Sequence, residues 1–178
     1  MRPRLALSIA VAASVSLAAL AQAATSKTVT MDAISAQGVG ASLGTITIED
    51  SSRGLLLKMN LKGLPPGQHG FHLHANASCA AAEQNGQMTA GMAAGGHFDP
   101  DKTGKHLGPD AMGGHKGDLP VLTVAADGTA RVKLVAPHLK LADVAGHALM
   151  IHAGGDNFSD QPKPLGGGGA RIACGVVM

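Results

Sequence analysis

Short runs in which hydrophobic and polar residues alternate recur along the chain. Residues 27–34 and 40–48 show the pattern first, with β-branched Thr, Val and Ile in the alternating positions. Alternation with a period of two is typical of a strand that buries one face. Similar runs follow at residues 55–61, 68–75, 121–125, 129–135, 147–152 and 171–177. The pattern predicts eight short strands and no convincing amphipathic helix, which favours an all-β antiparallel sandwich or barrel.

Two segments interrupt the strand rhythm, residues 76–118 and 153–170. Irregular insertions on a rigid β scaffold are where binding and catalytic residues usually lie. The second insertion contains the run Gly166–Gly169. We expect this run to be a loop with positive φ angles and not a phosphate cradle, since no Lys-Ser/Thr pair follows it.

The first residues have the features of a secretory signal. Arg2 and Arg4 form a basic start, residues 5–20 are apolar, and Ala21-Gln22-Ala23 is an A-x-A processing site. A retained membrane anchor is the alternative, but the apolar run is short for a membrane span. We therefore expect residues 1–23 to be a cleaved signal peptide and residues 24–178 to be a single exported domain, which would have no contact with the membrane after cleavage.

Composition limits the choice of core and partner. Without Arg2 and Arg4, 12 basic residues face 12 acidic ones, so the mature chain is formally neutral. Neutrality gives no case for nucleic acid or an anionic membrane as partner. The chain has three Phe and no Trp or Tyr, so the core must be mainly aliphatic.

Two cysteines remain in the mature chain, Cys79 and Cys174. An exported chain with two cysteines most simply forms one internal disulfide, although two free thiols or an intermolecular bridge are alternatives. Closing a loop of roughly 95 residues would contribute about 4 to 5 kcal/mol in the chain-entropy model.

The segment from His97 to Asp118 is a candidate metal loop. It contains His97, His106, His115 and Asp118 among glycines and prolines, without apolar periodicity. Three imidazoles and a carboxylate suit a tetrahedral zinc ion, which would organise a loop that burial cannot. The alternative is a solvated polar loop, because the spacing fits no short zinc-finger pattern.

Other histidines lie on predicted strands. His72 and His74 are two residues apart and so project from one face, as two chelating imidazoles or as a hydrogen-bonded pair. His152 ends another strand, and Asp156 follows it in a tight turn. A carboxylate there can accept from the second nitrogen of a metal-binding histidine, or it can cap its own turn.

Five motifs, taken together, resemble the copper,zinc superoxide dismutase family in its bacterial, exported branch. They are Gly70-Phe71-His72-Leu73-His74, residues 95–100 (GGHFDP), residues 113–120 (GGHKGDLP), residues 151–157 (IHAGGDN) and residues 167–176 (GGGARIACGV). The resemblance spans residues 28–178. It implies an eight-stranded Greek-key barrel with two long functional loops, a periplasmic location, copper and zinc as cofactors, and superoxide as substrate. The expected reaction converts superoxide to oxygen and hydrogen peroxide by a Cu(II)/Cu(I) cycle.

The resemblance also implies residue roles. Copper would be held by His72, His74, His97 and His152, and zinc by His97, His106, His115 and Asp118. His97 would bridge the ions and deliver a proton, and Arg171 would guide the anion. Asp156 would link His72 to His106, His69 would be a structural histidine beside the copper strand, and Cys79 would pair with Cys174.

Several points stay open at this level. The loop after His152 lacks the clustered Glu and Lys of eukaryotic members, and the resemblance leaves monomer and homodimer open. Met88 and Met92 have side chains that can bind Cu(I), whereas His138 and His147 are expected to be solvated or structural. Rival functions are a metal carrier using the same histidines and a disulfide-stapled β module that binds a protein.

Overall fold

The fold is that of a computed structural model, which describes residues 26–178. The predicted signal peptide, residues 1–23, lies outside the described residues. Among the described residues, none of the helices has the length and apolar character needed to cross a membrane.

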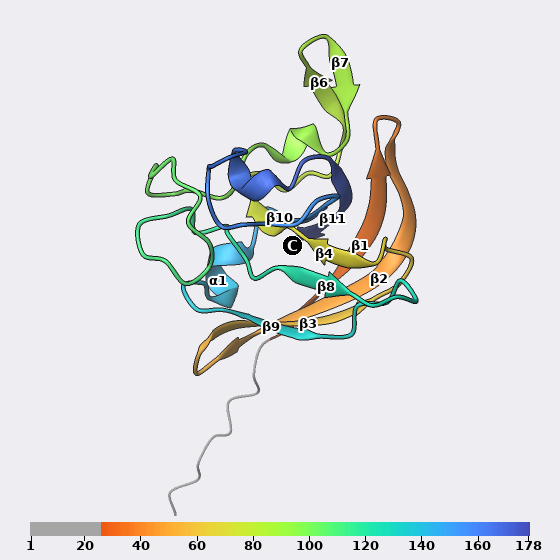
Figure 1. The fold of residues 1–178 in the computed structure, drawn as a ribbon. Helices are drawn as coiled ribbons and strands as arrows, with labels where there is room; N and C mark the ends of the chain where they lie inside the picture. The colour runs from red at the N-terminus through yellow and green to blue at the C-terminus, as the bar shows by residue number, and fades with distance from the viewer. Residues whose placement is uncertain (1–25) are drawn as a thin grey trace, which may run out of the picture.

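A curled antiparallel sheet of seven strands forms most of the barrel (Figure 1). Its order is β5 (Phe71–His74), β10 (His147–His152), β11 (Arg171–Val177), β1 (Ser26–Ser35), β2 (Gly38–Ser51), β3 (Gly54–Leu61) and β9 (Lys133–Ala136). A second sheet pairs β4 (Gly67–His69) with β8 (Leu122–Val124). Neighbours such as β3 and β9 are far apart in sequence, which is the mark of the Greek-key connections expected from the resemblance.

The eight predicted strand regions are present, with two differences. The run 68–75 is divided at Gly70, because β4 pairs with β8 whereas β5 pairs with β10. The run 129–135 pairs with β3 through the Leu61–Ala130 bridge, but its regular ladder begins only at Lys133. Both differences arise because pairing partners change within a run whose hydrophobic alternation is continuous.

Segment 76–118 contains a hairpin for which no strand was predicted, β6 (Ala82–Gln84) and β7 (Gln87–Thr89). It stands out from the barrel in Figure 1. Its turn is Asn85-Gly86, and both residues have positive φ, 53° and 79°. Asn-Gly is the preferred pair for such a turn, so the sequence carried a hairpin signal that the strand pattern missed.

The remaining regular elements are single turns. They are α1 (Leu141–Val144), η1 (Met92–Ala94) and η2 (Leu165–Gly167). The last one places the glycine run in a loop, and Gly166, Gly167 and Gly169 have positive φ as predicted. None of these turns is long enough to form a layer of its own.

The core is aliphatic, as the composition requires. Ile46, Ile48, Leu57 and Leu73 are fully buried in the main cluster, together with Phe71. A smaller cluster contains Ile34, Ala94, Ala148, Met150 and Cys174, with Cys79 packed against it. Cys79 and Cys174 form the internal disulfide, with Cα atoms 5.6 Å apart, and the bond ties segment 76–96 to β11.

Both ends of the candidate metal loop are hydrogen-bonded to β5. Leu73 N donates to Gly117 O and Phe98 N donates to Leu73 O, each at 2.8 Å. The approach at Gly117 requires glycine, because a Cβ there would lie 2.3 Å from Leu73 O. The loop itself has no helix or extended strand, as predicted. Isolated β-bridges join it to the strand that carries His72 and His74, which brings strand and loop histidines together.

Candidate metal centre

Seven predicted ligand residues converge beside β5 and β10, in two groups that share His97. Within each group the ligand atoms lie within 4.8 Å of one another. Six of the seven are buried and His115 is half-buried. The groups are His72, His74, His97 and His152, and His97, His106, His115 and Asp118.

In the first group, the backbone holds one nitrogen of two rings. His74 Nδ1 lies 2.9 Å from Gly95 O, and His152 Nδ1 lies 3.1 Å from Gly169 O. Since a carbonyl oxygen accepts, each Nδ1 carries the proton. The two free Nε2 atoms face each other at 3.4 Å, which presents two lone pairs at one point.

The other two rings of this group each leave a buried nitrogen without a partner. His72 Nε2 is held by Asp156 Oδ2 at 2.6 Å, and its Nδ1 has no hydrogen bond. His97 Nδ1 is held by Asp118 Oδ1 at 3.0 Å, and its Nε2 has no hydrogen bond. A buried nitrogen without a partner is costly unless an ion satisfies it, so this donor set fits a metal ion.

The second group centres on one oxygen of Asp118. His97 Nδ1 lies 3.0 Å, His106 Nδ1 2.9 Å and His115 Nδ1 3.4 Å from Asp118 Oδ1. The other oxygen, Oδ2, accepts the N–H groups of Leu107 and Gly108 at 3.1 Å. Three imidazole nitrogens and one oriented carboxylate oxygen are a ligand set that fits zinc.

Asp156 links the two groups. Its Oδ2 lies 2.6 Å from His72 Nε2, and its Oδ1 lies 2.7 Å from His106 Nε2. Gly166 packs on this bridge, since a Cβ there would lie 1.9 Å from Asp156 Oδ1 and 2.8 Å from His106 Nε2. The carboxylate therefore fixes one ring in each group at the same time.

Burial keeps most of the imidazoles neutral. It lowers the pKa of His74 to about 2, of His152 to about 3 and of His97 to about 4. Burial also acts to lower the pKa of His106, but hydrogen bonds to Asp118 and Asp156 outweigh it and raise that pKa to about 9. Neutral imidazoles are the form that binds metals, so His74 and His152 need not lose a ring proton before the lone pair is free, whereas His97 could serve two ions only after losing the proton on Nδ1.

A pocket of about 360 Å³ opens onto the first group. His74, His97 and His152 lie in it together with Arg171 and Met92. Arg171 Nη1 donates to Gly91 O at 2.6 Å and Nη2 donates to Gly95 O at 2.7 Å, which fixes the guanidinium. A fixed guanidinium beside unprotonated imidazoles gives the pocket a local positive charge suited to a small anion.

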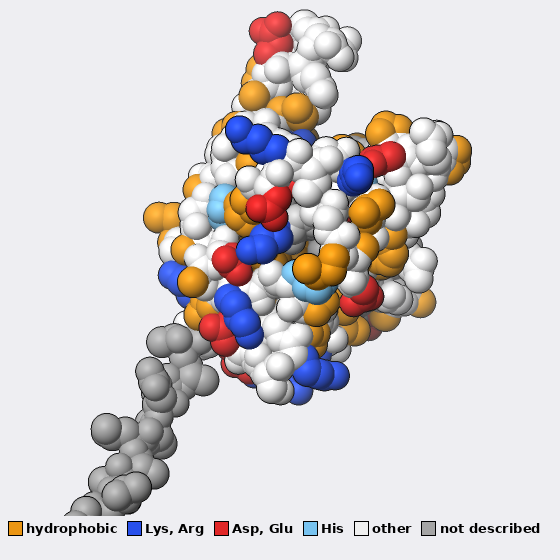
Figure 2. Space-filling model, turned by 90° about the vertical axis from the view of Figure 1, so that its left-hand side faces the viewer, with side chains coloured by type: hydrophobic (Ala, Val, Ile, Leu, Met, Phe, Trp, Pro, Cys, Tyr) orange, Lys and Arg blue, Asp and Glu red, His pale blue; other side chains and the backbone are white. Residues whose placement is uncertain are grey.

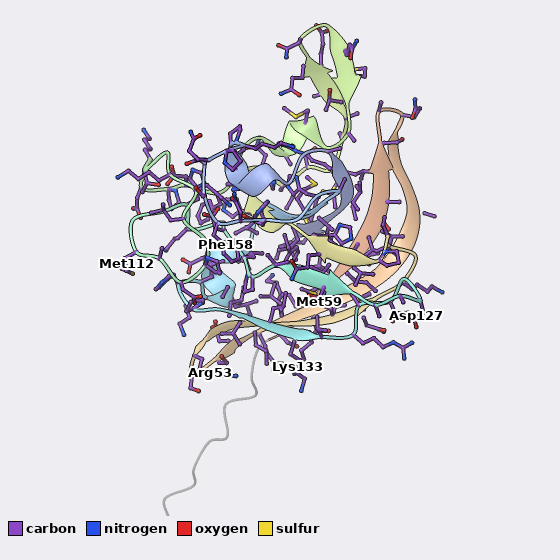
Figure 3. The ribbon with its side chains drawn as sticks, in the orientation of Figure 1. Arg53, Met59, Met112, Asp127, Lys133 and Phe158 are labelled. Atoms are coloured by element: carbon purple, nitrogen blue, oxygen red, sulfur yellow. A yellow bond between two sulfur atoms is a disulfide. The ribbon has the colours of Figure 1, made fainter. Side chains whose placement is uncertain are left out.

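Charge outside the pocket is mixed on the face shown in Figure 2, where basic and acidic side chains alternate. That face therefore presents no extended region of one sign, and any attraction of an anion there depends on individual charged side chains. Phe158 packs on Gly108 of the metal loop, and Met112 lies at the outer edge of that loop (Figure 3). The aromatic ring at 158 thus joins the two long loops.

The remaining histidines lie outside both groups. The ring of His69 lies between the carbonyl oxygens of His152 and Pro65, at 2.7 and 2.8 Å, next to the strands of the first group. His147 Nδ1 bonds Ala75 O at 2.7 Å, and His138 Nε2 lies 3.4 Å from Asp110 O. The placement agrees with the structural roles expected of them.

Sequence reasoning missed three contributors. The carbonyl groups of Gly91 and Gly95 orient Arg171, and the carboxylate of Asp160 accepts the backbone N–H of His106. Backbone acceptors have no residue-type signature. Asp160 stands in a polar loop where nothing in the sequence separates it from an ordinary turn residue.

Comparison with known proteins gives one consistent result. The family model "Copper/zinc superoxide dismutase (SODC)" matches residues 42–177. "Superoxide dismutase [Cu-Zn] 2" of Salmonella typhimurium is 56% identical over 158 residues, which cover 88% of this chain and 90% of that protein. "Superoxide dismutase [Cu-Zn]" of Escherichia coli K12 is 53% identical over 158 residues, with the same coverage.

Solved structures agree with the sequence comparison. The Cu/Zn superoxide dismutase of Brucella abortus superposes with a TM-score of 0.85 at 51% identity, covering 86% of this chain and 100% of that one. The monomeric copper, zinc superoxide dismutase of Salmonella enterica gives a TM-score of 0.78 at 57% identity with the same coverage. The family match spans most of the chain, the relatives match at more than half identity, and the histidine groups fit two metal ions, so the chain belongs to the copper/zinc superoxide dismutase family.

Proposed function

We propose that His72, His74, His97 and His152 hold copper in this protein, that His97, His106, His115 and Asp118 hold zinc, and that the imidazole of His97 is shared between the two ions. The protein is a superoxide dismutase, an oxidoreductase that uses copper and zinc. One superoxide is oxidised to oxygen, a second is reduced to peroxide, and two protons are consumed to give hydrogen peroxide.

The orientation of the ring nitrogens is the observation that carries the assignment. Asp156, Gly95 and Gly169 hold one nitrogen of His72, His74 and His152, and the other nitrogen of each ring faces the first group. In His97 the partner of Nδ1 is Asp118, itself a member of the second group, and Nε2 has no hydrogen bond, although His97 belongs to both groups. An imidazole ring in this position is suited to bridging two metal ions.

Copper, when bound, supplies the one-electron exchange, and zinc supplies a fixed positive charge that keeps the loop closed. The chain's own groups do the rest. Arg171 binds the anion in the pocket, oriented by the carbonyl groups of Gly91 and Gly95. His97 Nε2, which has no hydrogen-bond partner within the protein, takes up a proton and gives it to the reduced product.

A metal carrier using the same histidines is the rival function. Carrier sites are exposed and exchange their ion readily, whereas the histidines of the first group are almost completely buried. Arg171, held over the same pocket, has a use in binding an anionic substrate and none in carrying a cation. The burial of the histidines and the position of Arg171 both favour an enzyme over a metal carrier.

Metal analysis combined with an activity assay tests the assignment. We expect about one copper and one zinc per chain, and dismutation that disappears on copper removal and returns with copper. His97→Ala should lose the bridge and most activity, whereas His138→Ala, a matched control outside both groups, should keep both. Full activity in His97→Ala would refute the proposed role of His97.

We also propose that the mature protein lies in the periplasm after cleavage behind Ala23. The basic start, apolar run and A-x-A site support export, and an internal disulfide suits an oxidising compartment. N-terminal sequencing of protein recovered by osmotic shock should begin at Ala24. A start at Met1 in the cytosolic fraction would contradict the proposal.

A further inference from the structure

Asp160 makes two hydrogen bonds that the proposed mechanism does not use. Its Oδ2 accepts the backbone N–H of His106 at 3.0 Å, across 54 residues of sequence. Its Oδ1 accepts the backbone N–H of Leu165 at 3.2 Å, five residues further along its own loop. One carboxylate therefore joins the loop of residues 153–170 to the metal loop at a zinc ligand.

Leu165 has an unfavourable backbone conformation. Its φ is 54°, in the left-handed region that residues other than glycine seldom adopt. Its side chain lines the pocket above the first histidine group. The next residue, Gly166, packs directly on the hydrogen bond between Asp156 and His106. Leu165 thus adjoins the pocket over the first group and Gly166 adjoins the contact between Asp156 and His106, and Asp160 holds the N–H of Leu165.

His106 is consequently held by two carboxylates of the same loop. Asp156 binds its ring at Nε2, and Asp160 binds its backbone N–H. The N–H groups of Leu107 and Gly108 are held by Asp118 within the metal loop, so Asp160 adds the backbone contact that comes from the other loop. Hydrogen bonds to an ionised carboxylate are stronger than those between neutral groups, which suits a contact between two loops.

We propose that Asp160 is a positioning residue that sets the zinc ligand His106 and the pocket wall at Leu165 in one arrangement, so that zinc retention and the shape of the copper pocket depend on the same carboxylate. The proposal rests on the proposed role of His106 as a zinc ligand. Asp160 itself touches neither the ions nor the substrate.

The matched control is Asp127. It also accepts two hydrogen bonds with one carboxylate oxygen, from Thr129 N at 3.0 Å and from Thr129 Oγ1 at 2.8 Å. Both donors belong to its own turn, beyond β8 and away from the histidine groups. Asp127→Ala removes the same charge and the same number of bonds without joining two loops.

The experiment measures the rate at which a strong chelator removes zinc from the fully metallated protein. Asp160→Ala should lose zinc about tenfold faster than wild type, the range seen when a partner of a metal ligand is removed. Asp160→Asn should fall between them, because one amide oxygen can accept only one of the two N–H groups. Asp127→Ala should stay within about twofold of wild type.

Amide hydrogen exchange in the metal-free protein gives the second readout. In Asp160→Ala the His106 and Leu165 amides should exchange faster, while the amides of β10 and β11 should keep their wild-type rates. A residue that only stabilises the barrel would raise all of these rates and lower the melting temperature together.

Zinc loss in Asp160→Ala within twofold of wild type would overturn the proposal. Faster zinc loss accompanied by faster exchange throughout the barrel would also overturn it. If Asp160→Ala does not fold, Asp160→Asn decides by the same criteria. Failure of the zinc assignment itself would appear elsewhere, as a His106→Ala protein that still retains zinc.

Discussion

Arg171 and His74 share one acceptor, the carbonyl oxygen of Gly95. Nη2 of Arg171 lies 2.7 Å and Nδ1 of His74 lies 2.9 Å from this oxygen. The carbonyl therefore fixes the guanidinium proposed to bind the anion and a proposed copper ligand relative to each other. The disulfide between Cys79 and Cys174 ties the segment that contains Gly95 to β11, where Arg171 begins the strand.

Arg171→Ala should lower kcat/KM by about tenfold or more, because the pocket loses its fixed positive charge. The dependence of the rate on salt should weaken, and copper and zinc contents should stay at wild-type levels. Arg131→Ala, which removes an exposed arginine outside the pocket, is the control. Wild-type kcat/KM in Arg171→Ala would contradict the role given to this residue.

Gly166→Ala should release zinc readily and lose activity. The added Cβ would lie 1.9 Å from Asp156 Oδ1, so the carboxylate must leave His106. Gly86→Ala is the matched control, since Gly86 has a similar φ of 79° and no atom within 4 Å of the added Cβ. The control should cost only the backbone strain, about 1 kcal/mol of unfolding free energy. Equal zinc contents in the two variants would refute the steric argument.

Asp156→Ala should weaken zinc binding about 10- to 100-fold, because His106 loses the group that orients its ring. Copper binding should weaken as well, since His72 Nε2 loses its partner at 2.6 Å. Competition with chelators of known affinity measures both effects. Should only one ion be affected, the view of Asp156 as a link between the two groups would be wrong.

Zinc affinity of the metal-free protein should depend on pH through His106. Hydrogen bonds to two carboxylates raise its pKa to about 9 against the effect of burial, so Nδ1 is protonated at neutral pH and must lose a proton to bind zinc. Affinity should rise about tenfold per pH unit up to about pH 9 and then level. A flat profile would contradict the protonated state.

The raised pKa of His106 also determines how the stability of the metal-free protein changes with pH. A raised pKa means that protonated His106 stabilises the metal-free fold fully below about pH 6.5, and that this contribution is lost as the pH rises through about 9. Urea titrations of the metal-free protein from pH 6.5 to 9.5 should show falling stability. The His106→Gln protein should lack that part of the slope.

Breaking the disulfide should destabilise the fold and the pocket together. Cys79→Ser with Cys174→Ser should cost about 2 to 5 kcal/mol of unfolding free energy. Because Gly91 and Gly95 lie in the segment tied by the bond, Arg171 should also lose its orientation and kcat/KM should fall. Unchanged activity in a folded double variant would show that the disulfide does not act through Arg171.

Local pattern in the sequence was enough to locate the strands. The eight runs of alternation correspond to strands, although β5 and β10 are buried on both faces. The absence of periodicity between His97 and Asp118 correctly indicated a loop. Pattern could not locate the change of partner at Gly70, because hydrophobic alternation says nothing about which strand lies alongside. The Asn85-Gly86 hairpin has strands too short for the pattern to detect.

For the site, the sequence motifs identified the histidines but not the contacts that orient them. His72, His106 and Asp156 are far apart in sequence, and only the resemblance suggested that they meet. The backbone acceptors at Gly91 and Gly95 have no side chain to recognise. Asp160 could be recognised only once the two long loops were seen side by side, because its partner His106 lies 54 residues away.

The sharing of His97 between two ions is the central claim, and electron paramagnetic resonance tests it most directly. Cobalt(II) held by the second group and copper(II) held by the first group would be coupled magnetically through a shared imidazole. We predict that the copper(II) signal of the zinc-containing protein is strongly diminished when cobalt replaces zinc. A copper signal of equal intensity with cobalt and with zinc would show that the two ions share no ligand, and would contradict the account.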